Sequence, residues 1–120
     1  MPIRDNIFVT PVSAGISPVD VLVFGSQSAV PDSTETTVAS YTALGEETIG
    51  DIMMGGTSYA RFNIYLNTVL SFVVRSGPQR HIDLLFGRPW QLSVGDVVDV
   101  KVIHYNVDDT DDFEVTVLGI

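Results

Sequence analysis

The sequence LSVGDVVDVKVIHY at residues 92–105 decides the fold. A Gly-Asp pair leads into a run in which Val98, Val100 and Val102 alternate with charged side chains. Alternation with a period of two places the valines on one face of a strand and the charges on the other. Valine is also stiff about χ1 and packs well on a pleated surface. The stretch therefore predicts a half-buried β-strand.

A hairpin is expected before this strand. Residues 60–66 and 69–75 both alternate between apolar and other side chains, and the two runs meet at Asn67-Thr68. Two alternating runs joined by a tight turn are typical of adjacent antiparallel strands.

The remaining chain continues this pattern of short strands and turns. Glycine-containing sequences at residues 55–56 and 87–89 are expected to end strands, and the acidic stretch at 106–112 is expected to be a loop. About eight strands separated by turns predict an all-β fold, either an antiparallel β-sandwich or a jelly roll. The other strands are expected at residues 19–24, within 32–47, and at 48–54, 82–86 and 113–117.

The first part of the chain is rich in proline, which cannot donate a hydrogen bond to a neighbouring strand. It is either an irregular approach to the first strand or an arm that pairs with a neighbouring subunit. We expect an N-terminal arm at residues 1–18 and a β-sandwich domain at residues 19–120. The apolar residues of the arm that would contact a neighbour are Ile3, Ile7, Phe8 and Val9.

Composition restricts the classes of function. The net charge of −9 argues against a nucleic-acid-binding protein, which needs a basic face. The chain has no cysteine, which excludes disulfides and thiolate chemistry. No apolar run approaches the length of about 18 residues that suggests a membrane span, and no signal peptide is recognisable. We therefore expect synthesis in the cytoplasm and no membrane association.

Two groups of residues have the composition of chemical sites. The acidic stretch Asp108–Asp112 could bind a hard cation, but it lacks the EF-hand glycine and glutamate, and a solvated turn is favoured. His81 and Asp83 would share one face of a strand and could orient a base or a metal. Because neither a third histidine nor a nucleophile motif accompanies them, polar surface or interface positions are favoured for His81 and His104. We expect no enzyme activity, no metal site and no cofactor.

The strongest candidates for binding lie on one strand. The face opposite the apolar side chains of residues 60–66 is expected to carry Tyr59, Arg61, Asn63 and Tyr65. Tyrosine and arginine are enriched at protein interfaces, and aromatic rings also stack on sugars. A subunit contact is favoured, with a plain outer sheet face and a glycan platform as alternatives. Trp90, the sole tryptophan, is expected to cover the core.

Two resemblances suggest a function. The Leu-x-x-Gly-Asp-x-Val pattern that begins at Leu92, with the final run 113–120, is similar to the closing strands of the tumour-necrosis-factor and complement-C1q-like group. The whole chain resembles small virion proteins of tailed bacteriophages, being short, acidic, free of cysteine and rich in turns. Those proteins include head decoration (cement) proteins and jelly-roll modules of tail fibres and baseplates.

These resemblances imply a homotrimer and a structural role in a virus particle. We expect a capsid decoration or cement protein in the virion, in contact with copies of itself and with the major capsid protein. The alternative is a tail-fibre or baseplate module that binds a host glycan through Tyr59, Tyr65 or Trp90. No stalk or secretion signal of the complement type is recognisable, which favours the phage resemblance.

Overall fold

The computed structural model describes residues 20–78 and 80–120, with the backbone alone at residues 80 and 81. The predicted arm at 1–18, including its contact residues Ile3, Ile7, Phe8 and Val9, lies outside the described residues. Within them, every regular element is a strand. The strands are β2 (Asp20–Pro31), β3 (Thr36–Thr42), β4 (Glu47–Gly56), β5 (Ala60–Leu66), β6 (Val69–Ser76), β7 (Arg80–Leu92), β8 (Val97–His104) and β9 (Thr110–Gly119).

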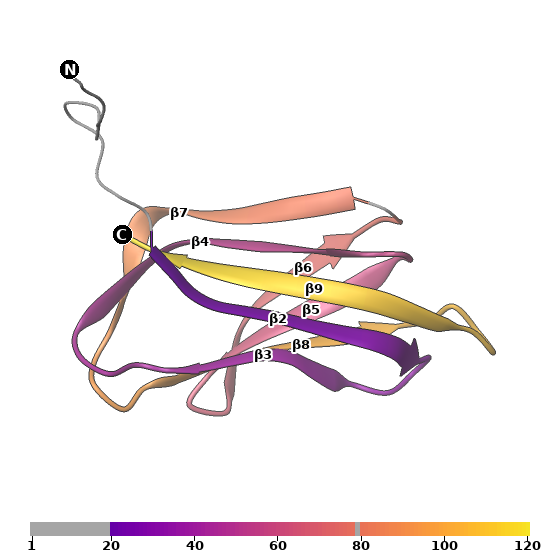
Figure 1. The fold of residues 1–120 in the computed structure, drawn as a ribbon, viewed down its shortest axis with the longest axis horizontal. Coiled ribbons are helices and arrows are strands. Elements are labelled where there is room, and N and C mark those ends of the chain that lie inside the picture. Colours follow the sequence, from indigo (N-terminus) through magenta and orange to yellow (C-terminus); the bar gives the residue numbers. More distant parts are fainter. Residues whose placement is uncertain (1–19, 79) are drawn as a thin grey trace, which may run out of the picture.

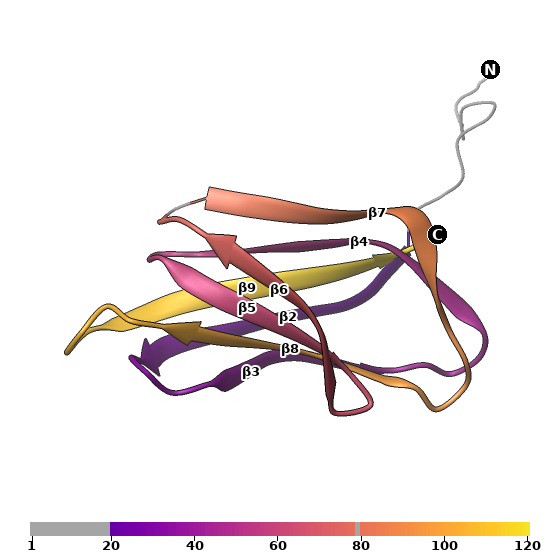
Figure 2. The ribbon, with the colours of Figure 1, turned by 180° about the vertical axis from the view of Figure 1, so that it is seen from behind.

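The eight strands form two four-stranded antiparallel sheets that pack face to face (Figures 1 and 2). One sheet has the order β2-β9-β4-β7 and the other the order β3-β8-β5-β6. Consecutive strands alternate between the sheets, apart from the hairpin of β5 and β6, and the last strands insert between the first ones. This connectivity is that of a jelly roll, so the predicted fold class is confirmed.

The core lies between the sheets and is built by the predicted alternation. Val98, Val100 and Val102 are almost completely buried, while the residues between them in β8 are only half-buried. From the opposite sheet, Phe113 of β9 meets Phe62 of β5 edge to face, with ring centroids 5.9 Å apart. The other fully buried large side chains are Val30, Ile49, Ile52, Met54, Ile64, His104, Val115 and Val117.

The Gly-Asp pair forms the turn between β7 and β8. Gly95 has a φ of 88°, and the amide of Asp96 donates to the carbonyl of Ser93, as in a type II turn. The Asp96 carboxylate accepts hydrogen bonds from the Ser93 amide and from Asn67 Nδ2. This turn is therefore tied to the hairpin turn of β5 and β6, in which Asn67 and Thr68 have the positive φ values of a type I′ turn.

The connections between strands gather at the two ends of the sandwich. The β2–β3, β4–β5, β6–β7 and β8–β9 connections lie at one end, on the right in Figure 1. The β3–β4 and β7–β8 connections and the β5–β6 turn lie toward the other. We call the first of these the loop end.

Three strands differ from their predicted limits. β2 continues to Pro31, well beyond residue 24. β7 does not break at residues 87–89: it continues to Leu92, while its register with β4 jumps on either side of Gly50. β7 is an edge strand, so Pro89 can lie in it without removing a hydrogen bond from the sheet interior. β4 includes the Gly55-Gly56 pair that was expected to end it.

A fourth strand, β9, differs at the acidic stretch. β9 begins at Thr110, so Asp111 and Asp112 belong to a strand rather than to a loop. Asp111 precedes Phe113 by two residues and shares its buried face. Among the described residues, no helix is long and apolar enough to cross a bilayer.

Candidate functional site

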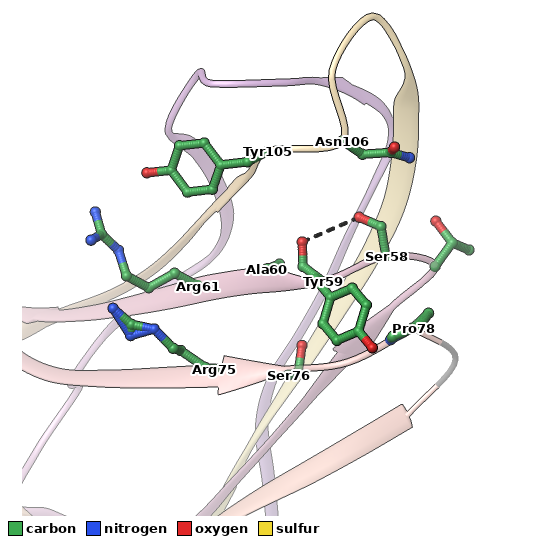
Figure 3. A pocket seen from close by; sticks show the side chains of 10 residues that line it. Ser58, Tyr59, Ala60, Arg61, Arg75, Ser76, Pro78, Tyr105 and Asn106 are labelled. Carbon is green, nitrogen blue, oxygen red and sulfur yellow. Dashed lines mark hydrogen bonds between the residues drawn. The ribbon is translucent and has the colours of Figure 1, made fainter.

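A hollow of about 540 Å³ opens at the loop end, beside the outer surface of the β3-β8-β5-β6 sheet (Figure 3). It lies between the β4–β5 connection, the end of β6 and the start of the β8–β9 connection. Its size falls within the range of about 300 to 1,000 Å³ typical of small-molecule sites. It is lined by Thr57, Ser58, Tyr59, Ala60, Arg61, Arg75, Ser76, Pro78, Tyr105 and Asn106.

Two arginines form one side of the hollow. Arg61 in β5 and Arg75 in β6 lie directly opposite each other in the antiparallel register. Both side chains project from the face opposite Phe62, because alternate residues of a strand point to opposite sides. The lining contains no carboxylate, and neither guanidinium lies within 4.0 Å of a carboxylate of the described residues. The hollow is therefore locally positive on a chain whose net charge is −9.

Two polar atoms of the lining are buried without a hydrogen-bond partner among the described residues. They are Nε of Arg61 and Oγ of Ser76. Ser76 is 5% exposed, and its hydroxyl is drawn beside the hollow in Figure 3. Buried polar atoms in native proteins are nearly always paired, so two unpaired donors at one hollow call for an explanation.

Two tyrosines flank the opening. Tyr59 is 74% exposed and Tyr105 is 59% exposed. In Figure 3, the Tyr59 ring lies toward Pro78, and the Tyr105 ring projects on the same side as the Arg61 side chain. A ligand in the hollow would therefore meet aromatic surface as well as guanidinium groups.

The polar part of the lining is held by a network beneath it. Thr57 Oγ1 donates to one carboxylate oxygen of Asp111 (2.8 Å), and Asn106 Nδ2 donates to the other (3.1 Å). Nδ1 of the buried His104 lies 3.4 Å from the same carboxylate. Burial alone raises the pKa of Asp111, but hydrogen bonds from Asn106, Thr57 and Ser58 and the charge of His104 outweigh it and hold that pKa below its ordinary value.

This network corrects the interpretation of His104. The sequence favoured a surface or interface position, yet the side chain is fully buried and its Nε2 lies 2.6 Å from the carbonyl oxygen of Val30. The reason is that β8 alternates as far as His104, which therefore shares the buried face of Val98, Val100 and Val102. The predicted pairing of His81 with Asp83 is not tested, because only the backbone of His81 is described.

The acidic stretch does not assemble a cation site within the described residues, where no group of three or more possible ligands lies together. Asp111 is turned inward to His104, and the Asp112 carboxylate accepts a hydrogen bond from the amide of Ala29 (2.9 Å).

Of the predicted binding residues, Tyr59 and Arg61 line the hollow and Tyr65 does not. The Tyr65 hydroxyl donates to Glu35 (2.6 Å), which also accepts from Asn63 Nδ2 (2.8 Å). These hydrogen bonds lower the pKa of Glu35, and the bond to Glu35 raises the pKa of Tyr65. Nζ of Lys101 lies 4.9 Å from the Tyr65 ring centroid. Tyr65 thus belongs to a separate cluster farther along the same face.

Trp90 is occupied in packing. Its ring lies 5.2 Å from that of Phe72 and 5.6 Å from that of Phe86, and all three are partly buried against the core. It covers the core, as expected, and contributes nothing to the hollow.

The sequence did not single out Arg75, Ser76 or Tyr105 as binding residues. Arg75 falls in the predicted strand at residues 69–75. Pairing the two strands outward from the Asn67-Thr68 turn brings it near Arg61. Ser76 was assigned to the break after that strand, and nothing in the sequence places Tyr105 beside either arginine.

Comparison with known proteins adds no identity to this site. No protein-family model matches the sequence, and no curated protein matches it significantly.

Proposed function

We propose that the chain is a structural protein of a bacteriophage particle, of the capsid decoration or cement type. Its jelly-roll body would contact copies of itself as a homotrimer, and it would bind the major capsid protein. The single observation that carries the proposal is the composition of one sheet face. We call outer face the side of the β3-β8-β5-β6 sheet turned away from the core, with side chains Arg61, Asn63, Tyr65, Leu70, Val73, Arg75 and Lys101.

The outer face has the composition of a protein interface. Leu70 and Val73 of the edge strand β6 are 50% and 47% exposed, and Tyr65 lies directly opposite Leu70. Aromatic residues and arginine beside apolar side chains are enriched at such surfaces. An uncovered apolar edge strand is also prone to non-specific pairing, and a subunit contact removes that hazard.

Solution mass tests the trimer directly. Light scattering over a concentration series should give three times the chain mass of 13.0 kDa. Leu70→Asp should shift the mass toward one chain, because it places a charge in the contact. Leu85→Asp is the matched control, since Leu85 is 70% exposed on the edge strand of the other sheet. A single-chain mass at every concentration overturns the homotrimer, and a trimer that survives Leu70→Asp overturns the outer face as its contact.

The particle role is tested on purified virions. Particles from the phage or induced prophage that carries the gene, banded on a density gradient, should contain this chain in a fixed ratio to the major capsid protein. Its absence from washed particles overturns the proposal.

A second candidate function is supported by the hollow at the loop end. A tail-fibre or baseplate module would bind a host glycan there, with the exposed ring of Tyr59 against the sugar. A glycan array tests this with Tyr59→Ala and, as control, Tyr65→Ala, because Tyr65 lies outside the hollow. Binding that is absent, or that is indifferent to Tyr59→Ala, counts against it.

A further inference from the structure

The geometry points to an acidic sugar as the ligand of the hollow at the loop end: a pyranose that carries a carboxylate, as uronic acids do. This inference rests on the second candidate function and narrows it to one chemical class. Four features of the hollow carry it.

The first feature is the arginine pair. Like charges placed directly opposite each other in a sheet destabilise it. Arg61 and Arg75 stand in this relation. The charge of Arg61 helps to lower the pKa of Glu35 nearby, but no carboxylate lines the hollow between the two arginines. An anion between two guanidinium groups removes the repulsion and accepts charge-assisted hydrogen bonds from both. The carboxylate is planar, so it matches the fork of a guanidinium better than a spherical anion does.

The second feature is the pair of unpartnered donors. Nε of Arg61 and the hydroxyl of Ser76 are both buried, and neither has a hydrogen-bond partner among the described residues. Ser76 follows Arg75 in β6 and pairs with the buried Ala60, so its side chain leaves the strand on the core side, whereas the arginines project from the outer side. A ligand would have to reach around the end of β6 to meet the arginine and the hydroxyl together, which calls for oxygen atoms at two separate positions. A sugar acid has its carboxylate and its ring hydroxyls at separate positions.

The third feature is the remaining lining. Asn106 brings to the hollow a side-chain amide whose Nδ2 also donates to Asp111, and Ser58 brings a hydroxyl that bonds Asp111 as well as the carbonyl of Tyr59, the latter at a long 3.4 Å. Hydroxyl and amide groups both donate and accept, as sugar hydroxyls do. A lining of this kind favours a ligand rich in hydroxyls over a bare inorganic anion.

The fourth feature is aromatic surface at the rim. The largely exposed rings of Tyr59 and Tyr105 offer apolar faces beside the charged groups. Tyrosine combines an apolar body with a polar tip and loses little conformational freedom on binding. The C–H face of a pyranose can pack on such a ring while the carboxylate reaches the arginines.

The test compares an acidic saccharide with its methyl ester, which keeps the sugar rings and lacks the negative charges. Isothermal titration with trigalacturonate should show saturable binding, and its fully methyl-esterified form should bind at least about tenfold more weakly. Arg75→Gln should weaken trigalacturonate binding about tenfold, because a charge-assisted hydrogen bond is lost. Arg88→Gln removes the same charge from an exposed position in β7 outside the hollow and should leave the affinity unchanged.

The outcomes separate this inference from the function on which it rests. Equal affinity for the acid and its ester, reduced by Tyr59→Ala, keeps glycan binding and overturns the acidic sugar. Binding of inorganic phosphate as tight as that of trigalacturonate, with no effect of Tyr59→Ala, also overturns it. No binding of either saccharide overturns the acidic sugar, and the glycan array with Tyr59→Ala then decides glycan binding separately. Arg75 is exposed and faces Arg61, so Arg75→Gln should melt no lower than the wild type, and a lost affinity in this variant is then not a loss of folding. Arg61→Gln is the second variant.

Discussion

Replacing Gly25 by alanine is expected to destabilise the protein strongly, because no side chain fits where β2 passes β3. A Cβ atom at Gly25 would overlap the carbonyl oxygen of Val38. It would also lie 2.9 Å from the carbonyl carbon of Val38 and 3.0 Å from Cα of Ala39. All three atoms belong to the backbone, so no change of rotamer relieves the overlap, and the two strands must move apart.

The size of the effect follows from what has to move. β2 and β3 are edge strands of different sheets, so their separation also opens the core beside the buried Val38 and Ala39. Overpacking a core typically costs about 1 to 3 kcal/mol. Because the obstacle is backbone, we expect about 3 kcal/mol, near the upper end. For a domain of this size, that loss lowers the melting temperature by about 12 °C.

Thermal unfolding followed by circular dichroism measures this, with urea titration as an independent check. Gly87→Ala is the matched control: Gly87 also lies in a strand, and a Cβ there would have no atom within 4 Å. The control should change stability by less than about 0.5 kcal/mol. If Gly25→Ala melts within about 2 °C of the control, the close packing of β2 on β3 is refuted.

Three further predictions concern single side chains. Thr68→Gly should stabilise the hairpin by about 1 kcal/mol, because Thr68 has a φ of 69° that glycine adopts without strain. The expected result is a higher midpoint of urea unfolding with an unchanged m-value. The hydrogen bond between Tyr41 and Glu47 raises the pKa of Tyr41 to about 12, so Glu47→Gln should return this phenol toward 10.0 in an ultraviolet titration compared with Tyr41→Phe. The pKa of Asp111 is lowered in the folded protein, so its ionised form stabilises the fold at neutral pH, and that contribution is lost as the pH falls below 3.8. Asp111→Asn should therefore have a smaller free energy of unfolding than the wild type at neutral pH. Below pH 3.8 its free energy of unfolding should also change less with pH, and a dependence on pH as steep as that of the wild type contradicts this prediction.

The sequence predicted the parts of the fold that local patterns determine. Alternating valines specified β8, and the Asn67-Thr68 turn specified the hairpin, because each signal lies within a few neighbouring residues. The strand limits failed where pairing overrides local signals. β7 continues through Pro89 because an edge strand has one side free of sheet hydrogen bonds, and the sequence alone does not show which strands are edges.

The buried polar network was missed for a related reason. Asp111 looks like part of a charged loop, but its spacing from Phe113 places it on the core side of β9. An aspartate is tolerated there only because Thr57, Asn106 and His104 come from other elements to meet it. Those contacts join residues up to 54 positions apart, and no local pattern encodes them.

The hollow could be predicted only in part. Tyr59 and Arg61 were recognisable because residue type and alternation placed them together on an outward face. Arg75, Ser76 and Tyr105 join them through the register of β6 and the path of the β8–β9 connection. A binding site made at the ends of several strands depends on their lateral order, which here was known only from the structure.

Arg61 and Arg75 repel each other across the sheet, so the sequence retains a pair that lowers local stability. The chain has 15 acidic residues against 6 lysines and arginines, so an acidic partner for Arg75 was readily available to selection. Instead, Arg61 and Arg75 face each other with no carboxylate among the lining residues and with a buried Nε left unpaired. Natural sequences break the rules of local consistency mainly at functional sites. The same reasoning does not apply to Tyr65, whose hydroxyl and ring are satisfied by Glu35 and Lys101. Under the inference above, the loop end is the place on this jelly roll where a ligand, rather than the fold, would account for the choice of residues.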